Sequence, residues 1–72
     1  MNTIEFKKLL IDKGISNLDQ LQAATGLTKP TLISYKNGAR RPSITGMTKI
    51  IRGLNMSKAE VKKVFPEEVN IF

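Results

Sequence analysis

The sequence contains no cysteine, no histidine and no tryptophan. Without cysteine the chain has no disulfide, no thiolate ligand for zinc and no thiol nucleophile. Without histidine it lacks the commonest metal ligand and the commonest general base. No pair of carboxylates and no spacing of a nucleophile and a base stands out among the remaining residues. We therefore expect a protein that is not an enzyme, that has no small-molecule substrate, and that needs no metal or other cofactor.

Long hydrophobic runs are missing as well. No apolar stretch approaches the roughly 18–20 residues that a membrane-spanning helix needs. Near the start of the chain, Glu5, Lys7 and Lys8 interrupt the apolar run that a signal peptide would require. The absence of cysteine fits a reducing compartment. The sequence thus predicts a cytoplasmic protein with no membrane partner.

The 72 residues suffice for one small domain, whose stability must come from well-packed helices or from a partner subunit. Apolar residues recur at helical spacing and are separated by short segments rich in glycine, asparagine and proline. This pattern predicts an all-α, compact bundle of about five short helices. The expected helices cover residues 3–13, 18–25, 29–36, 44–54 and 57–65. The domain is expected to span residues 1–66 and to be followed by a short C-terminal tail, 67–72.

Capping residues and apolar positions give the expected helices their ends and their buried faces. The expected N-caps are Asn2, Asn17, Thr28, Ser43 and Ser57. The residues expected to face the core are Phe6, Leu9, Leu10, Leu18, Leu21, Ala24, Leu32, Tyr35, Ile44, Met47, Ile50, Ile51 and Leu54. Gly46 and Gly53 weaken their helix by about 0.5–1 kcal/mol each relative to alanine, and they indicate either close helix contact or loose packing.

Charge is distributed unevenly along the chain. Twelve Lys and Arg residues against six Asp and Glu residues give a net charge of +6. No acidic residue lies between Asp19 and Glu60, although this stretch contains seven Lys and Arg residues. A field of one sign attracts a polyanion such as nucleic acid. The alternative is a solvated basic face that improves solubility.

The segment from the second to the third expected helix has the pattern of a helix-turn-helix. Ala23 is small enough to let the next helix cross closely, and Gly26 allows the sharp turn. Leu32 then supplies an aliphatic contact that holds the two helices together at a steep angle.

From Leu21 to Ser57 the chain resembles the helix-turn-helix domain of the Cro and lambda-type repressor family. The residues that carry the resemblance are Leu21, Ala24, Gly26-Leu27-Thr28, Thr31-Leu32, Tyr35, Gly38, Arg40-Arg41-Pro42-Ser43, Ile44, Met47, Ile50, Leu54 and Ser57. The resemblance implies that the helix over residues 29–36 enters the major groove of double-stranded DNA, with its N-terminal half toward the base edges. It also implies a small phage-type transcriptional regulator, associated with the nucleoid of a bacterial host.

The resemblance assigns roles to individual residues. The candidates for base contact are Lys29, Pro30, Thr31, Ile33 and Ser34. The candidates for phosphate contact are Asn17, Thr28, Lys36, Asn37, Arg40 and Arg41. A lysine donates well to guanine O6 and N7, and an isoleucine contacts a thymine methyl. The alternative for the polar helix residues is ordinary surface polarity, and for Arg40-Arg41 it is a solvated loop.

An apolar residue on the reading helix also supports a second interpretation. Ile33 cannot hydrogen-bond to a base, and an exposed apolar side chain often marks a protein interface. The alternative function is therefore a modulator or antirepressor that binds a partner repressor protein through the helix-turn-helix surface. Useful DNA specificity would in turn need two half-sites about 34 Å apart, hence a weak homodimer. The candidate interface residues are Ile33, Val64, Phe65, Val69, Ile71 and Phe72.

Overall fold

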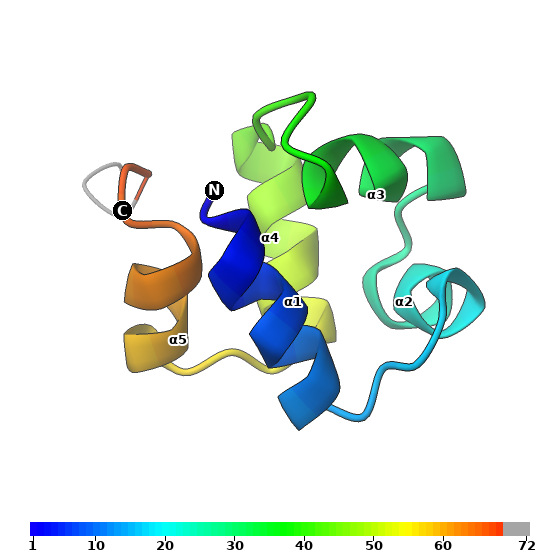
Figure 1. The fold of residues 1–72 in the computed structure, drawn as a ribbon, viewed down its shortest axis with the longest axis horizontal. Helices are drawn as coiled ribbons and strands as arrows, with labels where there is room; N and C mark the ends of the chain where they lie inside the picture. The colour runs from blue at the N-terminus through cyan, green and yellow to red at the C-terminus, as the bar shows by residue number, and fades with distance from the viewer. Residues whose placement is uncertain (69–72) are drawn as a thin grey trace.

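The computed structural model describes residues 1–68, and in this range it contains five α-helices and no strand. The helices are α1 (Thr3–Asp12), α2 (Leu18–Thr25), α3 (Lys29–Lys36), α4 (Ile44–Gly53) and α5 (Lys58–Val64) (Figure 1). The all-α prediction is confirmed. Each predicted helix end agrees with the observed end to within one residue.

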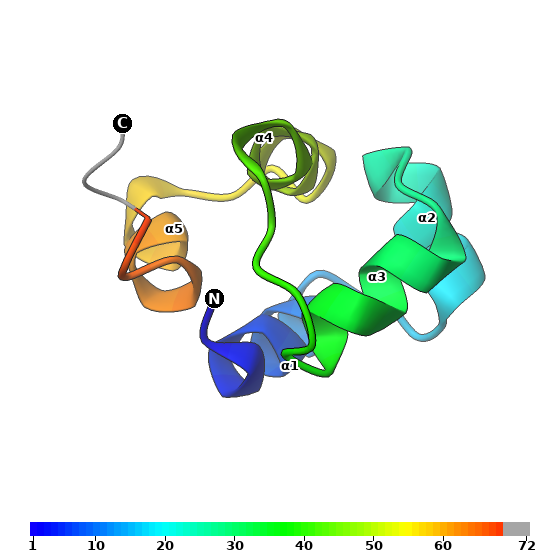
Figure 2. The same cartoon turned by 90° about the horizontal axis from the view of Figure 1, so that it is seen from above.

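The helices surround one core, with α2 and α3 on one side and α5 on the other. α1 contacts α3 and α5, and α2 contacts α3 and α4. Figures 1 and 2 both show α1 and α4 between α5 and the pair formed by α2 and α3. This arrangement leaves α3 at the periphery of the bundle, far from α5.

Side-chain caps start four of the five helices as predicted. Each cap accepts a hydrogen bond from the amide three residues further on, and the four capping residues are Asn2, Asn17, Ser43 and Ser57. Thr28 is the N-cap residue of α3, as predicted, but its hydroxyl donates to the Thr31 hydroxyl at 2.9 Å and makes no hydrogen bond to the backbone of α3.

The core draws on all five helices and on the residues that directly follow α4 and α5. The buried apolar side chains are Phe6, Leu9, Leu10, Leu21, Leu32, Tyr35, Met47, Ile50, Leu54, Val64 and Phe65. One predicted core residue is wrong: Ile44 is 57% exposed. It is the first residue of α4, where the helix begins at the edge of the bundle. Gly46, in the same helix, marks a close contact, since an added Cβ would lie 2.7 Å from the Tyr35 hydroxyl.

Two of the residues expected to form an interface belong to this core instead. Val64 is 1% exposed and Phe65 is 0% exposed, so neither is accessible to a partner. The physical reason is that α5 packs against α1 with these side chains inward, and the Asn2 amide also donates to the Val64 carbonyl at 2.7 Å. The other three residues of that predicted surface, Val69, Ile71 and Phe72, lie outside the described residues.

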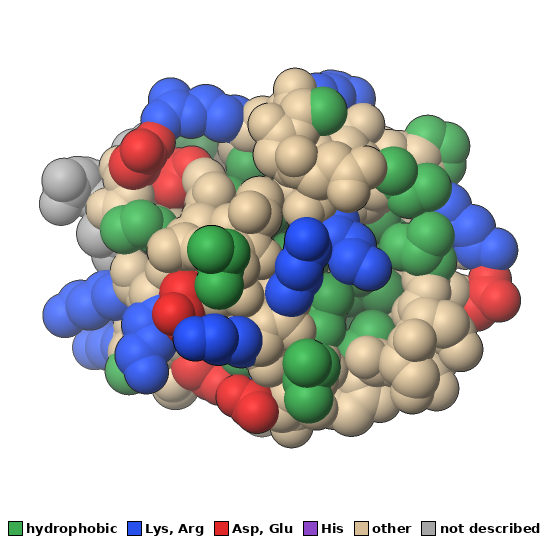
Figure 3. All heavy atoms as spheres, in the orientation of Figure 1, with side chains coloured by type: hydrophobic (Ala, Val, Ile, Leu, Met, Phe, Trp, Pro, Cys, Tyr) green, Lys and Arg blue, Asp and Glu red, His purple; other side chains and the backbone are tan. Residues whose placement is uncertain are grey.

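Exposed apolar side chains on α1 stand apart from one another. Ile4 and Ile11 are both exposed. The face that α1 occupies shows hydrophobic side chains interspersed with basic and acidic ones (Figure 3). Isolated residues of this kind are ordinary on protein surfaces and indicate no site by themselves.

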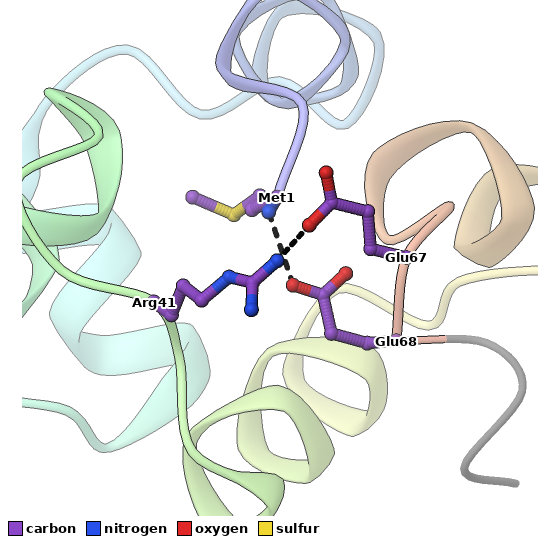
Figure 4. A network of polar contacts seen from close by, with 4 residues as sticks. All are labelled: Met1, Arg41, Glu67 and Glu68. Carbon is purple, nitrogen blue, oxygen red and sulfur yellow. Dashed lines mark hydrogen bonds and ion pairs between the residues drawn. The ribbon is translucent and has the colours of Figure 1, made fainter.

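The chain continues to pack beyond residue 66, where the domain was expected to end. The buried Glu68 carboxylate accepts a hydrogen bond from the Met1 ammonium at 3.1 Å. Glu67 forms an ion pair with Arg41, in the segment between α3 and α4 (Figure 4). The described start of the tail thus joins the beginning of the chain to the connection that follows α3.

Candidate nucleic-acid interface

The connection between α2 and α3 makes the sharp turn that Gly26 led us to expect. Gly26 ends α2 in the left-handed conformation, with φ of +74°, and its amide donates to the Gln22 carbonyl at 2.8 Å. A residue with a side chain adopts this conformation only with strain, whereas glycine does not. The fully buried Leu21 and Leu32 then hold the two helices together.

Thr25 is a structural residue of the turn that sequence reasoning missed. Its buried hydroxyl donates to the Leu21 carbonyl at 2.8 Å and accepts from the Leu27 amide at 3.3 Å. These two bonds tie the end of α2 to the connection before α3. The only sequence signal for this role is a threonine directly before a helix-ending glycine, and that signal does not show that the Thr25 side chain is buried.

The base-contact candidates lie on α3, which no other helix covers when the molecule is seen from above (Figure 2). Three of them are exposed and two are half-buried: Lys29, Pro30 and Ile33, then Thr31 and Ser34. The inward side of the same helix carries the buried Leu32 and Tyr35. The structure therefore brings the five candidates together on one helix while the opposite side of that helix anchors it.

The first turn of α3 keeps donors available. Because the Thr28 hydroxyl makes no bond to the backbone of α3, the Thr31 amide has no acceptor within residues 1–68. The Lys29 amide, at the first position of the helix, has none in that range either. Pro30 has no amide hydrogen to satisfy. A helix start with unpartnered amides attracts an anion such as a phosphate group.

The segment after α3 folds back on the end of that helix. Gly38 adopts φ of +75°, and the amides of Ala39 and Arg40 both donate to the Ser34 carbonyl, at 2.9 Å and 3.3 Å. Arg40 and Asn37 are exposed here, and Lys36 is half-buried. These phosphate-contact candidates are thus held at the C-terminal end of α3.

Asn17 and Lys36, far apart in sequence, line one groove of about 460 Å³ beside the start of α2. Lys7 of α1 lines it as well, and sequence reasoning did not single out that residue. The floor is apolar and includes Leu10 and Leu21. Figure 3 shows a hollow of this kind, with hydrophobic side chains inside it and basic side chains at its edge.

Two of the candidate cations are paired with carboxylates in the free protein. Lys29 forms an ion pair with Asp19 of α2, and Arg41 forms one with Glu67. All four side chains are substantially exposed, so water screens both pairs strongly. A phosphate or a base at these positions must therefore replace a carboxylate partner.

The start of α2 is less open to a phosphate than its position implies. The Asn17 side chain already accepts from the Gln20 amide at 2.9 Å. Asp19 lies in the first turn and carries a negative charge, which Lys29 balances. A phosphate group at this helix end would consequently compete with Asp19 for Lys29.

Within residues 1–68, no group of three acidic, histidine or cysteine residues could hold a metal ion. Of the helices in that range, none is long and apolar enough to cross a bilayer.

Comparison with known proteins gave one match. A model of the Cro/C1-type helix-turn-helix DNA-binding domain matches residues 5–67. No curated protein and no solved structure matches the chain. The family match covers α2 to α5 in full and all of α1 except its first two residues, and thus includes both α3 and the connection that carries Arg40 and Arg41.

Proposed function

Because the chain belongs to the Cro/C1-type helix-turn-helix DNA-binding family, we propose that it is a small phage-type transcriptional regulator whose α3 occupies the major groove. The observation that carries this proposal is the uncovered outer side of α3, with its basic flank at Arg40 and Arg41. The net charge of +6 adds an attractive field for a polyanion. The protein acts in the bacterial cytoplasm at the nucleoid, without a cofactor.

The side chains of α3 make different kinds of contact with the DNA. Lys29 donates to guanine, and the hydroxyls of Thr31 and Ser34 bond to base edges or to phosphates. Ile33 contacts a thymine methyl, and Pro30 contributes van der Waals contact only. With so few base-specific donors on one helix, useful specificity requires two copies on half-sites about 34 Å apart.

Phosphate contacts then orient the helix. At the N-terminal end of α3, Thr28 and the free amides of the first turn contact phosphate groups. At the C-terminal end of α3, the phosphates are contacted by Lys36, Asn37, Arg40 and Arg41. Asn17, at the start of α2, contacts a further phosphate of the DNA backbone. Contacts of this kind position a protein on DNA without reading its sequence.

Salt dependence tests this assignment. The logarithm of the binding constant for duplex DNA falls with the logarithm of salt concentration, with a slope of about −0.9 per phosphate contact. Replacing both Arg40 and Arg41 by alanine is expected to flatten the slope by about 2 units and to weaken all DNA sequences alike. The control Lys63→Ala, on α5, is expected to leave the slope nearly unchanged. An unaltered slope in the double variant would contradict the phosphate role of both arginines.

A second candidate function is favoured by one specific observation. Ile33 is 43% exposed on α3, where a polar residue would read DNA better. In this alternative the chain is an antirepressor, and α3 binds a partner repressor protein with Ile33 as an apolar anchor. The comparison of Ile33→Ala in two binding assays, described in the Discussion, separates the two functions.

A further inference from the structure

A groove of about 430 Å³ lies between the C-terminal half of α4 and α5. Its floor is apolar and is formed by Ile51, Met56 and Val61, which are half-buried against the core. Its rim is basic and consists of Arg52, Lys58 and Lys62, all exposed. None of the described residues that line the groove is acidic.

The three cations of this rim are not neutralised within the described chain. None of them forms an ion pair with a residue of the range 1–68. The acidic residue of α5, Glu60, is engaged elsewhere: it accepts from the Ser57 amide at 2.8 Å and pairs with Lys13 at 3.2 Å. The rim therefore keeps its positive charge over an apolar floor.

Helix stability accounts for only two of the three rim cations, because Arg52 and Lys62 lie in the last turns of α4 and α5, where the helix dipole favours a positive charge. Lys58 is the first residue of α5, where the partial positive charge of the helix dipole disfavours a cation by a few tenths of a kcal/mol or more. DNA binding through α3 does not account for the rim cations. Figures 1 and 2 place α5 on the opposite side of α1 and α4 from α3.

We propose that the groove between α4 and α5 binds an acidic amphipathic helix of a partner protein. Apolar side chains of the partner fill the floor at Ile51, Met56 and Val61, and its carboxylates meet the basic rim. Such a helix in a groove is a common mode of peptide recognition, and complementary charge selects the partner.

The spacing of the rim charges decides between this occupant and a smaller ligand. Lys58 and Lys62 lie one helical turn apart on α5, and Arg52 faces them from α4. Carboxylates that repeat once per turn along a partner helix match this spacing, and the apolar floor adds a contact that a single small anion does not use. A second copy of the chain is disfavoured, because a two-fold axis through the groove would bring the same cations together.

A partner at this site leaves α3 free, so the protein can hold DNA and the partner helix at the same time. The proposal does not depend on what α3 binds. Its failure would leave the DNA-binding function untouched.

The test uses a fluorescein-labelled synthetic helix of fourteen residues, with leucine at every third or fourth position and glutamate between. Binding to the full chain is followed by fluorescence anisotropy, with and without saturating duplex DNA. Lys62→Glu is expected to weaken binding about fivefold or more, since an attraction is lost and a repulsion is added. The matched control is Lys63→Glu, the next residue of α5, which does not line the groove and changes the net charge equally. It is expected to weaken binding less than twofold.

Four results would overturn the proposal. The first is an equal loss in Lys62→Glu and Lys63→Glu, which would mean attraction to the net charge alone. The second is undiminished binding of a peptide with serine in place of leucine, which would show that the apolar floor is unused. The third is self-association of the wild-type chain that Lys62→Glu abolishes in sedimentation, which would make the occupant a second copy. Displacement of the peptide by duplex DNA would likewise contradict a separate site.

Discussion

Gly53 of α4 packs directly against the backbone of Ala24 of α2. A Cβ added at Gly53 would lie 2.2 Å from the Ala24 carbonyl oxygen and 2.8 Å from its carbonyl carbon. Since the obstacle is backbone, no change of side-chain rotamer relieves the clash. Gly53 thus allows the close contact that sets the position of α2 in the helix-turn-helix, and α4 is not loosely packed here.

The substitution Gly53→Ala is expected to destabilise the protein by about 1–3 kcal/mol, because overpacking forces the helices apart. This loss would come despite a gain of about 0.8–1 kcal/mol in helix propensity. Urea unfolding followed by circular dichroism measures the difference. Ala59→Gly, at an exposed position of α5, is the control that reports propensity alone. A neutral or stabilising Gly53→Ala would show that α2 moves away without cost.

The substitution Asp19→Asn is expected to strengthen DNA binding about twofold to fivefold at low salt, since an exposed ion pair such as Lys29–Asp19 contributes up to about 1 kcal/mol. Loss of this carboxylate releases Lys29 and removes a negative charge from the start of α2. Anisotropy titrations of duplex DNA at two salt concentrations measure the effect. Asp12→Asn on α1 changes the net charge equally and is the control. Equal gains in the two variants would indicate that net charge alone matters.

The substitution Ile33→Ala separates the two candidate functions. If Ile33 anchors a partner repressor, its truncation should cost about 2 kcal/mol or more, roughly thirtyfold in affinity for that protein. If Ile33 contacts a thymine methyl, the loss appears in operator binding instead. Both affinities are measured with the same preparation, and Ile33→Gln serves as the polar comparison for DNA. If neither affinity changes, Ile33 has no role in either contact.

Acid should reduce stability in part through Glu60. Hydrogen bonds from the Ser57 amide and from Lys13 lower the pKa of Glu60 below its ordinary value of 4.5. A carboxylate with a lowered pKa stabilises the fold above its unfolded pKa, and this contribution disappears as the pH falls through the folded pKa. The stability difference between wild type and Glu60→Gln, measured by urea unfolding, should therefore be larger at pH 7 than at pH 3. A difference that is the same at both pH values would contradict this role.

Much of the fold followed from local rules that act within a few residues. Asn17, Ser43 and Ser57 cap their helices in the structure as predicted, because a cap bonds to the amide three residues on. Gly26 ends α2 because its conformation is a local property of the backbone. Helical periodicity likewise identified the inward Leu32 and Tyr35. The candidate residues on α3, by contrast, were named from the resemblance to the Cro and lambda-type repressor family and not from periodicity.

Tertiary structure alone decided which groups meet across the bundle. The pairs Lys29–Asp19 and Arg41–Glu67 join residues that sequence spacing does not relate. Val64 and Phe65 are apolar in sequence, yet only the packing of α5 on α1 decides that they are core and not interface. Periodicity tells which residues share a face of a helix. It does not tell what that face will contact, because the contact depends on how all the helices fill one small core together.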